Sequence, residues 1–368
     1  MIKKLVHNLT TLRSDLLFSK KLKKLKGNSK LEGVDQAMRS EYQNYWKSKG
    51  LKAKTQYYDL YSNISMNIGP YYVPENLYYS HFEPALNNKA MLKTYSNKNL
   101  YQLIYDNKKL FPQVYARAIN GSFYSSNYQH LKEIKKLIEE HNPNSFIIKI
   151  ALDSGGGRGV ELFTKKNNQY IGSNGITFDE NNLLKDYGSD FIIQEYIAQH
   201  SFFKQFNESS VNTIRVFTYR SVKTEEIHIL HSILRIGKPG SIVDNQASGG
   251  MSCGIKNKTL NSFAVDKNGI RFTEINGYKF NEQAQIPYFE EVLTCAKNIA
   301  AQNHYARLLG LDFCIDQTNN IRLLEVNNSN NEINFYQMNN GPLFGEFTNE
   351  IVDWCSSHPK TICIDFSI

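Results

Sequence analysis

The sequence lacks a long apolar run and has few cysteines. No stretch reaches the roughly 18 apolar residues that a membrane-spanning helix needs, so we expect no such helix. The 5 cysteines are odd in number and form no CxxC pair, which disfavours both a disulfide framework and a zinc site. Residues 1–30 are too basic and too often interrupted to be a signal peptide. These absences predict a cytoplasmic protein with reduced thiols.

Acidic residues are scarce at the start of the chain. The whole sequence has 43 Lys and Arg against 35 Asp and Glu, a net charge of +8, and within residues 1–30 Asp15 is the single acid. Leucines recur there at helical spacing: Leu5, Leu9, Leu12 and Leu16. A basic amphipathic helix can lie peripherally at the inner face of an anionic membrane, or it can pack on its own domain. No nucleic-acid-binding module accompanies the charge, so we expect no nucleic-acid partner.

Strand-like and helical runs interleave after residue 97. We expect strands where β-branched and aromatic residues lie between Gly and Asn turns: Phe146–Leu152, Phe191–Ile197, Thr213–Tyr219, His228–Ile236, Leu311–Asp316 and Ile321–Asn327. Helices are expected at Lys98–Leu110, His130–His141, Pro287–Leu309 and Leu343–Ser356. Residues 1–95 are expected to be helical first and then loop-like, with prolines as breakers: Pro70, Pro74 and Pro84. This mixture predicts the α+β fold class.

The segment 310–327 is predicted to form a hairpin that carries acidic residues. Side chains alternate along a strand, so Asp312 points away from the face shared by its apolar neighbours, and Glu325 and Asn327 share one face of the second arm. Two carboxylates and an amide oxygen are hard ligands that suit magnesium. An edge hairpin whose acids face water is the alternative. Together with the motifs below, the segment favours a metal site at Asp312, Glu325 and Asn327.

A glycine cluster follows the strand at Phe146–Leu152. Its residues are Ser154, Gly155, Gly156, Gly157 and Gly159. Glycines let backbone N–H groups approach phosphate oxygens, although a flexible turn has the same composition. The spacing matches neither a P-loop nor a Rossmann motif. Lys149 lies in the preceding apolar strand, where it either binds an anion such as phosphate or extends from the strand edge into water.

Two further strands carry polar groups. The strand at 191–197 ends in residues that can form an adenine slot or a plain core strand: Gln194, Glu195, Tyr196 and Ile197. Arg215 lies in the middle of the strand at 213–219, where it can pair with phosphate or form a structural salt bridge.

The order of these motifs resembles the ATP-grasp superfamily over roughly residues 95–330. Its members share a lysine that opens a helix, a strand lysine before a glycine loop, a Glu-bearing hinge, a later basic residue and an acid–Glu–Asn metal set. Here the matching positions are Lys98, Lys149, the loop 154–159, Glu195 to Ile197, Arg215, and the set Asp312, Glu325 and Asn327. The resemblance implies two α+β subdomains that clasp ATP with Mg²⁺.

Within the superfamily the chain is most similar to the sugar-transfer-associated proteins. The likeness rests on short segments at 84–88, 97–101, 212–215, 234–237, 243–245 and 249–250. The D-alanine-ligase branch has an arginine just before the metal Asp, where this chain has Gly310. A small-residue and proline turn after the metal Asn is replaced by segment 328–331. Arg235 is therefore the candidate replacement for that arginine.

The resemblance implies three regions: 1–95, mainly helical; 96–198, the first ATP-grasp subdomain; and 199–368, the second with the metal site. It implies a ligase that activates an acidic sugar or other carboxylate through an acylphosphate, for attack by an amine or amino acid, in surface-polysaccharide biosynthesis. Catalytic roles fall on Lys149, Arg215 and Arg235, and substrate contacts on Arg235, Asp244, Asn245, Gly249 and Gly250. A kinase on the same fold and a non-catalytic nucleotide-binding adaptor are the rivals. The oligomeric state stays open.

Overall fold

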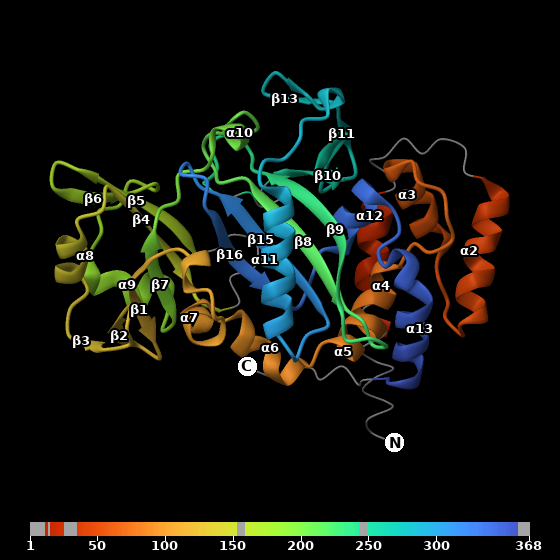
Figure 1. The fold of residues 1–368 in the computed structure, drawn as a ribbon, viewed down its shortest axis with the longest axis horizontal. Coiled ribbons are helices and arrows are strands. Elements are labelled where there is room, and N and C mark those ends of the chain that lie inside the picture. Colours follow the sequence, from red (N-terminus) through yellow and green to blue (C-terminus); the bar gives the residue numbers. More distant parts are fainter. Residues whose placement is uncertain are drawn as a thin grey trace.

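Two antiparallel sheets and a set of helices make up the protein (Figure 1). The computed structural model describes residues 12–13, 15–25, 35–152, 159–242, 244 and 249–359. In Figure 1 the smaller lobe lies on the left, the larger sheet in the centre and the N-terminal helices on the right. The predicted α+β class is confirmed.

The smaller sheet has 7 strands in the order β3-β2-β1-β7-β4-β5-β6. Its strands are β1 (Val114–Ile119), β2 (Ser122–Ser125), β3 (His130–Leu131), β4 (Ser145–Ile150), β5 (Val160–Lys166), β6 (Gln169–Gly172) and β7 (Phe191–Glu195). Helices α8 (Lys135–His141) and α9 (Leu183–Tyr187) cover one face, where Ile138 and Leu183 pack with Phe146 and Ile193. Because side chains alternate along a strand, Ile147 and Lys149 point from the other face of β4.

The larger sheet also has 7 strands, in the order β12-β11-β10-β9-β8-β15-β16. Its strands are β8 (Thr213–Arg220), β9 (Ile227–Ile236), β10 (Met251–Lys256), β11 (Thr259–Asp266), β12 (Arg271–Phe272), β15 (Leu308–Ile315) and β16 (Ile321–Asn327). A separate pair is formed by β13 (Glu274–Ile275) and β14 (Tyr278–Lys279).

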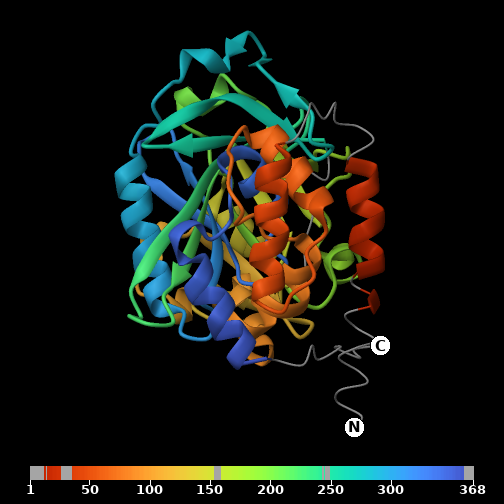
Figure 2. The same cartoon turned by 90° about the vertical axis from the view of Figure 1, so that its right-hand side faces the viewer.

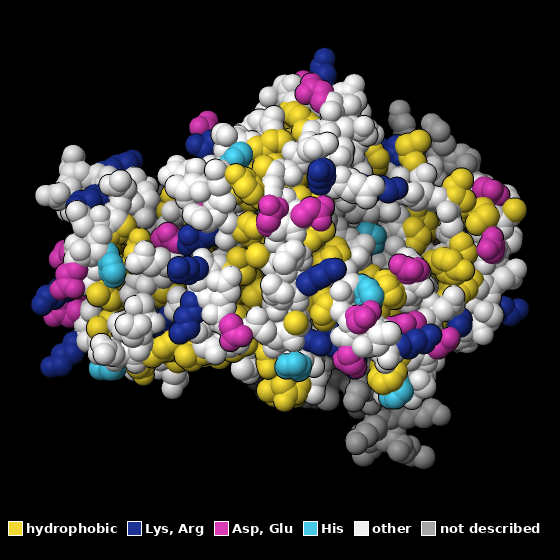
Figure 3. Space-filling model, viewed as in Figure 1, with side chains coloured by type: hydrophobic (Ala, Val, Ile, Leu, Met, Phe, Trp, Pro, Cys, Tyr) yellow, Lys and Arg dark blue, Asp and Glu magenta, His cyan; other side chains and the backbone are white. Residues whose placement is uncertain are grey.

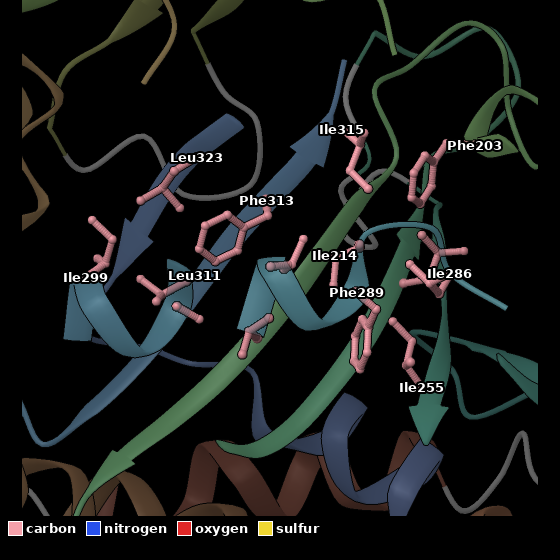
Figure 4. Packing of buried hydrophobic residues seen from close by; sticks show 14 of the residues in the cluster. Phe203, Ile214, Ile255, Ile286, Phe289, Ile299, Leu311, Phe313, Ile315 and Leu323 are labelled. Atoms are coloured by element: carbon pink, nitrogen blue, oxygen red, sulfur yellow. The ribbon is translucent and has the colours of Figure 1, made fainter. Parts of the chain in front are cut away.

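Helix α11 (Phe289–Gln302) covers one face of the larger sheet. Apolar residues of α11 recur at helical spacing and pack on β8, β15 and β16 (Figure 4). Leu311, Phe313 and Ile315 all point into this core, which leaves Asp312 on the opposite face. The expected alternation along the first hairpin arm is thus present.

The N-terminal helices cover part of the opposite face, as Figure 2 shows. The helices on this side are α2 (Gln36–Ser48), α3 (Thr55–Ser65), α4 (Glu75–Leu77), η1 (Tyr78–Phe82), α5 (Glu83–Leu86), α12 (Ile333–Asn340) and α13 (Thr348–Ser357). Trp46 of α2 and Tyr61 of α3 share one apolar core with Phe217 of β8 and Leu308 of β15. The N-terminal region is therefore packed into the larger lobe.

Four local expectations were wrong. The helix expected at Pro287–Leu309 ends at Gln302, and strand β15 begins at Leu308. Residues 98–110 form short turns rather than one helix: η2 (Lys98–Leu100), α7 (Tyr101–Ile104) and η3 (Lys108–Leu110). The chain is extended at Tyr105, whose ring packs on Phe111. The segment 130–141 begins as strand β3 because His130 and Leu131 pair with β2.

The tyrosine-rich part is mostly helical, and only residues 66–74 form the expected loop. Pro74 is the N-cap of α4, and Pro84 is the second residue of α5, which continues directly from η1. Between them η1 is a π-helical turn. Short helices also lie elsewhere: α6 (Lys89–Ser96), η5 (Glu180–Asn182), α10 (Ser201–Lys204), η7 (Phe280–Glu282) and η8 (Gly345–Phe347).

The described part of the basic N-terminus is helical at residues 15–25. Leu22 and Leu25 are buried against the N-terminal core, whereas Leu12, Leu16 and Leu17 are about 60% exposed (59%, 60% and 58%). Leu5 and Leu9 lie outside the described residues. Among the residues that are described, no helix is long and apolar enough to cross a membrane.

Surface charge is mixed, and the described thiols are free. Acidic and basic side chains are interspersed over the face drawn in Figure 3. Cys253, Cys295, Cys314 and Cys355 form no disulfide, and all but Cys295 are buried. Cys363 lies outside the described residues.

Candidate active site

A cavity of about 610 Å³ lies between the two sheets. Strands β4, β5 and β7 of the smaller sheet form one wall, and β8, β9, β15 and β16 of the larger sheet form the other. Most of the predicted site residues line it: Lys98, Lys149, Gln194, Glu195, Tyr196, Ile197, Arg215, Arg235, Asp244, Asp312, Glu325 and Asn327. The fold thus brings together motifs that are far apart in the sequence.

Arg215, Asp312 and Glu325 form a row across three neighbouring strands. Asp312 of β15 is paired in register with Arg215 of β8 on one side and with Glu325 of β16 on the other. Side chains that lie opposite each other in antiparallel strands share a face, so all three point toward the cavity. Asn327, two residues beyond Glu325, donates its amide N–H to Asp312 Oδ2 over 3.2 Å. The predicted hairpin is therefore present, with its polar residues on the cavity side.

Two arginines surround the Asp312 carboxylate. Arg215 donates from Nε and Nη2 to the two oxygens of Asp312, over 2.6 Å in each case. Arg235 Nη1 donates to Oδ2 over 3.0 Å. Burial by itself raises the pKa of Asp312, but the charges of Arg215 and Arg235 outweigh it and hold that pKa below its ordinary value. The salt bridge that the sequence left open for Arg215 is formed.

Arg235 also reaches a second carboxylate. Its Nη2 lies 3.5 Å from Asp244 Oδ1, and Asp244 accepts a hydrogen bond from the Thr213 hydroxyl. Burial raises the pKa of Asp244, and the charge of Arg235 opposes that rise. Asn245 lies outside the described residues. Gly249 and Gly250 are described but do not line the cavity.

Two lysines approach the row from the side of the smaller sheet. Lys98 Nζ donates to Glu325 Oε1 over 2.8 Å. Burial raises the pKa of Glu325, yet Lys98 more than offsets this and the pKa lies below its ordinary value. Lys149 makes no ion pair with a described residue, and burial followed by the nearby charge of Lys98 lowers its pKa. Neighbouring cations of this kind suit an anion such as phosphate.

The glycine loop is described only at its end. Residues 153–158, which include Ser154, Gly155, Gly156 and Gly157, lie outside the described residues. Gly159 has φ +68°, and a Cβ there would lie 2.2 Å from Ile150 Cδ1. Both the backbone angle and the close approach to β4 therefore require glycine at this position.

The oxygens of the acidic row fit a hard divalent cation. Glu325 Oε2 and Asn327 Oδ1 accept no hydrogen bond from a described residue, and Asp312 Oδ1 accepts one, from Arg215. Carboxylate and amide oxygens are preferred magnesium ligands. Among the described residues no group of three or more His, Cys, Asp and Glu side chains is arranged to hold a metal ion by itself. A magnesium ion here would complete its shell with water and phosphate oxygens, as this ion commonly does.

The opposite end of the cavity is apolar and suits a flat ring. Ile147, Leu162 and Leu324 line it beside the end of β7. The Glu195 carboxylate is occupied, because it accepts hydrogen bonds from Arg322 and from the Gln113 backbone N–H. The Glu195 side chain is therefore already held by hydrogen bonds within the protein.

The comparison with protein families decides the classification. The family described as sugar-transfer associated ATP-grasp matches residues 78–351. This chain belongs to that family. Its two facing sheets and its mainly helical N-terminal region are accordingly an ATP-grasp fold with an added helical part. No curated protein matches the chain.

Solved structures resemble this ATP-grasp chain only at low identity. D-alanyl-alanine synthetase A from Vibrio cholerae is 14% identical with a TM-score of 0.39, over 72% of this chain and 65% of that one. The biotin carboxylase domain of Hydrogenobacter thermophilus 2-oxoglutarate carboxylase, in complex with magnesium ADP, is 13% identical with a TM-score of 0.38, over 76% and 49%. N5-carboxyaminoimidazole synthetase from Staphylococcus aureus, complexed with ADP, is 13% identical with a TM-score of 0.34, over 66% and 44%. The chain thus spans less than two thirds of the length of each.

Sequence reasoning missed part of the ATP-grasp cavity. The loop after β16 lines the cavity through Asn328, Ser329, Asn330 and Glu332, and Ser209, Val211 and Ile242 also line it. The sequence did contain one indication that this loop is part of the site, because segment 328–331 replaces the proline turn of the D-alanine-ligase branch. The structure also shows why Gly310 is not an arginine: a Cβ there would lie 2.4 Å from Asn331 Oδ1. Arg235 reaches Asp312 from β9 instead.

Proposed function

We propose that this ATP-grasp protein is an ATP- and magnesium-dependent ligase that joins a carboxylate to an amine. The observation that carries the proposal is the row Arg215–Asp312–Glu325, which faces Lys149 across one cavity. Cations that can bind phosphate therefore lie beside oxygen ligands that can bind a metal. Phosphoryl transfer depends mainly on such positioning and charge stabilisation.

The nucleotide phosphates would lie against Lys98, Lys149 and Arg215, and the base against the apolar end beside Gln194, Tyr196 and Ile197. Magnesium held by Asp312, Glu325 and Asn327 would neutralise phosphate charge. The substrate carboxylate takes the γ-phosphoryl group, and an amine then displaces phosphate from the acylphosphate to give an amide. Lys149 and Arg215 stabilise the transferring group, and Arg235 orients the acid.

The acid that we propose is an acidic sugar such as a uronic acid, and the amine is an amino acid or another primary amine. The family description links these proteins to sugar transfer. The acceptor end has Arg235 near Asp244, and Thr213 and Ser209 supply hydroxyl groups for a sugar. We place the reaction in surface-polysaccharide (capsule) biosynthesis in the cytoplasm.

Phosphate release from ATP tests the ligase. Wild type would be assayed with magnesium, with D-glucuronate and D-galacturonate crossed against amino acids and other amines, beside Glu325→Ala. We expect release only when acid and amine are both present, and a loss of at least about 100-fold in the variant. Glu139→Ala is the matched control, because Glu139 is 61% exposed on α8. Release that survives Glu325→Ala would refute the assigned metal site.

Two experiments distinguish the ligase from a kinase and from a non-catalytic adaptor. A kinase would leave the phosphoryl group on a hydroxyl of the sugar and would release no free phosphate. An adaptor would keep its cellular function in Asp312→Asn, provided that the variant still folds. Its folding needs a separate check by circular dichroism, because the change removes the carboxylate that both Arg215 and Arg235 contact.

We also propose that the N-terminal helix contacts an anionic membrane surface. Leu12, Leu16 and Leu17 are exposed beside a basic run, while Leu22 and Leu25 hold residues 15–25 against the core. Exposed leucines and lysines together are the pattern of a helix that lies in a lipid headgroup layer.

A further inference from the structure

The charged side chains of the cavity are almost all paired. Nine acids and bases line it: Lys98, Lys149, Glu195, Arg215, Arg235, Asp244, Asp312, Glu325 and Glu332. Arg215 and Arg235 pair with Asp312, and Arg235 also lies near Asp244. Lys98 pairs with Glu325, and Glu195 pairs with Arg322. Only Lys149 and Glu332 have neither an ion pair nor a side-chain hydrogen bond with a described residue.

The charges of Lys149 and Glu332 are opposite in sign, so the two side chains suit different ligands. Lys149 lies with Lys98 at the phosphate end, which is the end that the proposed function assigns to ATP. Glu332 comes from the loop after β16, together with Ser329 and Asn330. A half-buried carboxylate that faces a cavity is stabilised by a cation that enters it.

The structure holds the backbone around Glu332 firmly on both sides. Before it, the Tyr79 hydroxyl donates to Asn331 O over 2.9 Å, and Asn87 Nδ2 donates to Asn328 O over 2.7 Å. After it, Ile333 is fully buried in the core that the N-terminal helices share, and Asn334 Nδ2 donates to Glu75 Oε2 over 2.9 Å. The N-terminal helical region thus fixes the loop from behind.

Glu332 is not needed to cap the helix that it precedes. It is the N-cap residue of α12, but its side chain makes no capping hydrogen bond. A carboxylate at this position ordinarily accepts from the first backbone N–H groups of the helix. This side chain lines the cavity instead.

We propose that Glu332 binds the ammonium group of the amine substrate. The inference rests on the proposed ligase function and specifies its second substrate: a primary amine that enters as an ammonium ion. One ammonium proton passes to the Glu332 carboxylate before the nitrogen lone pair displaces phosphate from the acylphosphate. The ammonium would form a charge-assisted hydrogen bond with the Glu332 carboxylate. Asp244 is less suited to this role, because its carboxylate already accepts from Thr213 and lies near Arg235.

Binding of small amines tests the proposal without requiring turnover. Saturation-transfer NMR on the protein with magnesium ADP would use four probes: ethanolamine, L-alanine, putrescine and D-glucosamine. We expect wild type to bind at least one of them, and Glu332→Gln, which keeps the shape and removes the charge, to raise its Kd at least about tenfold. Glu139→Gln, on the exposed face of α8, should leave the Kd unchanged. Unchanged ADP affinity in Glu332→Gln would show that the cavity is intact.

Two results would overturn the proposal: no probe binds wild type, or the same probe binds Glu332→Gln with unchanged affinity. Failure of the ligase function is detected separately. Hydroxylamine, which is mostly uncharged at neutral pH, would trap an acylphosphate as a hydroxamate when ATP and a uronic acid are present. Glu332→Gln should still form that hydroxamate, whereas a protein without ligase chemistry forms none in wild type either.

Discussion

Arg235 connects the metal end of the active site to the acceptor end, because its guanidinium group contacts one carboxylate at each end. One end of its guanidinium donates to Asp312 over 3.0 Å, and the other lies 3.5 Å from Asp244. Removing this side chain would leave two buried carboxylates with less compensating charge, which is costly in a site shielded from water. The residue therefore stabilises the metal end and shapes the acceptor end at the same time.

Glu83 gives a prediction about pH. It is 1% exposed in α5, and burial raises its pKa from 4.5 to about 7. The folded protein then binds the Glu83 proton more tightly than the unfolded chain does. The free energy of unfolding should therefore fall as the pH rises from about 4.5 to about 7, by roughly 3 kcal/mol from this residue. Urea unfolding at pH 5 and pH 8 measures the change.

The matched variant is Glu83→Gln, which cannot lose a proton. It should be more stable than wild type at pH 8 and should differ less at pH 5. Glu139→Gln, on the exposed face of α8, should follow wild type at both values. Parallel pH dependence in Glu83→Gln and wild type would show that Glu83 is not the group responsible.

Among the elements, strand β15 links the apolar core to the site. Its apolar side chains pack under α11, while Asp312 meets β8 and β16 on the cavity face. The strand also passes close to the loop that follows β16, since the Cα of Gly310 faces Asn331 and the Tyr336 hydroxyl. The position of that loop thus depends on a residue without a side chain.

Gly310→Ala should disturb this contact. The added Cβ would lie 2.4 Å from Asn331 Oδ1 and 3.3 Å from Tyr336 Oη, and Asn331 is almost fully buried. We expect a loss of about 1–3 kcal/mol in the free energy of unfolding and weaker binding of magnesium ADP, because the displaced loop lines the cavity. Denaturant unfolding and calorimetric titration measure the two effects.

Gly69→Ala is the control for that variant. A Cβ at Gly69 meets nothing within 4 Å, and its φ lies outside the left-handed region. Its stability and its nucleotide affinity should both stay close to wild type. Equal behaviour of the two alanine variants would mean that the loop tolerates a methyl group under it.

At the scale of the whole molecule, the N-terminal helices and the larger sheet share one core, whereas the smaller sheet has its own. The division predicted from the sequence at residues 95 and 198 stays a prediction. The shared core explains how residues 35–96 affect the site: they hold the loop at 328–334 through Tyr79, Asn87 and Glu75.

The outer face of residues 15–25 gives the prediction about membranes. The full chain should sediment with vesicles that contain phosphatidylglycerol and less with pure phosphatidylcholine, because Leu16 and Leu17 are exposed beside lysines. Leu16→Asp with Leu17→Asp should abolish binding, while Leu103→Asp, at another exposed leucine, should not. Equal binding to both vesicle types, or binding that survives the double variant, would argue against a membrane contact.

The sequence by itself determined the strands that carry the chemistry and the residues along them. Strand β16 has the predicted bounds, and β8 and β9 differ from prediction by one residue at one end. Side-chain alternation along a strand is a local property, so the sequence also predicted that Asp312 and Phe313 lie on opposite faces of the sheet.

Only the tertiary structure decided which charges meet. Arg215 and Asp312 are 97 residues apart, and Arg235 and Asp312 are 77 apart. Their pairing depends on the register of β8, β9 and β15, which is set by packing under α11 and on the N-terminal helices. The tertiary structure also leaves Lys149 and Glu332 in the cavity without an ion pair to any residue that the structure describes. Long-range register is a property of the whole core, so no local pattern could reveal it.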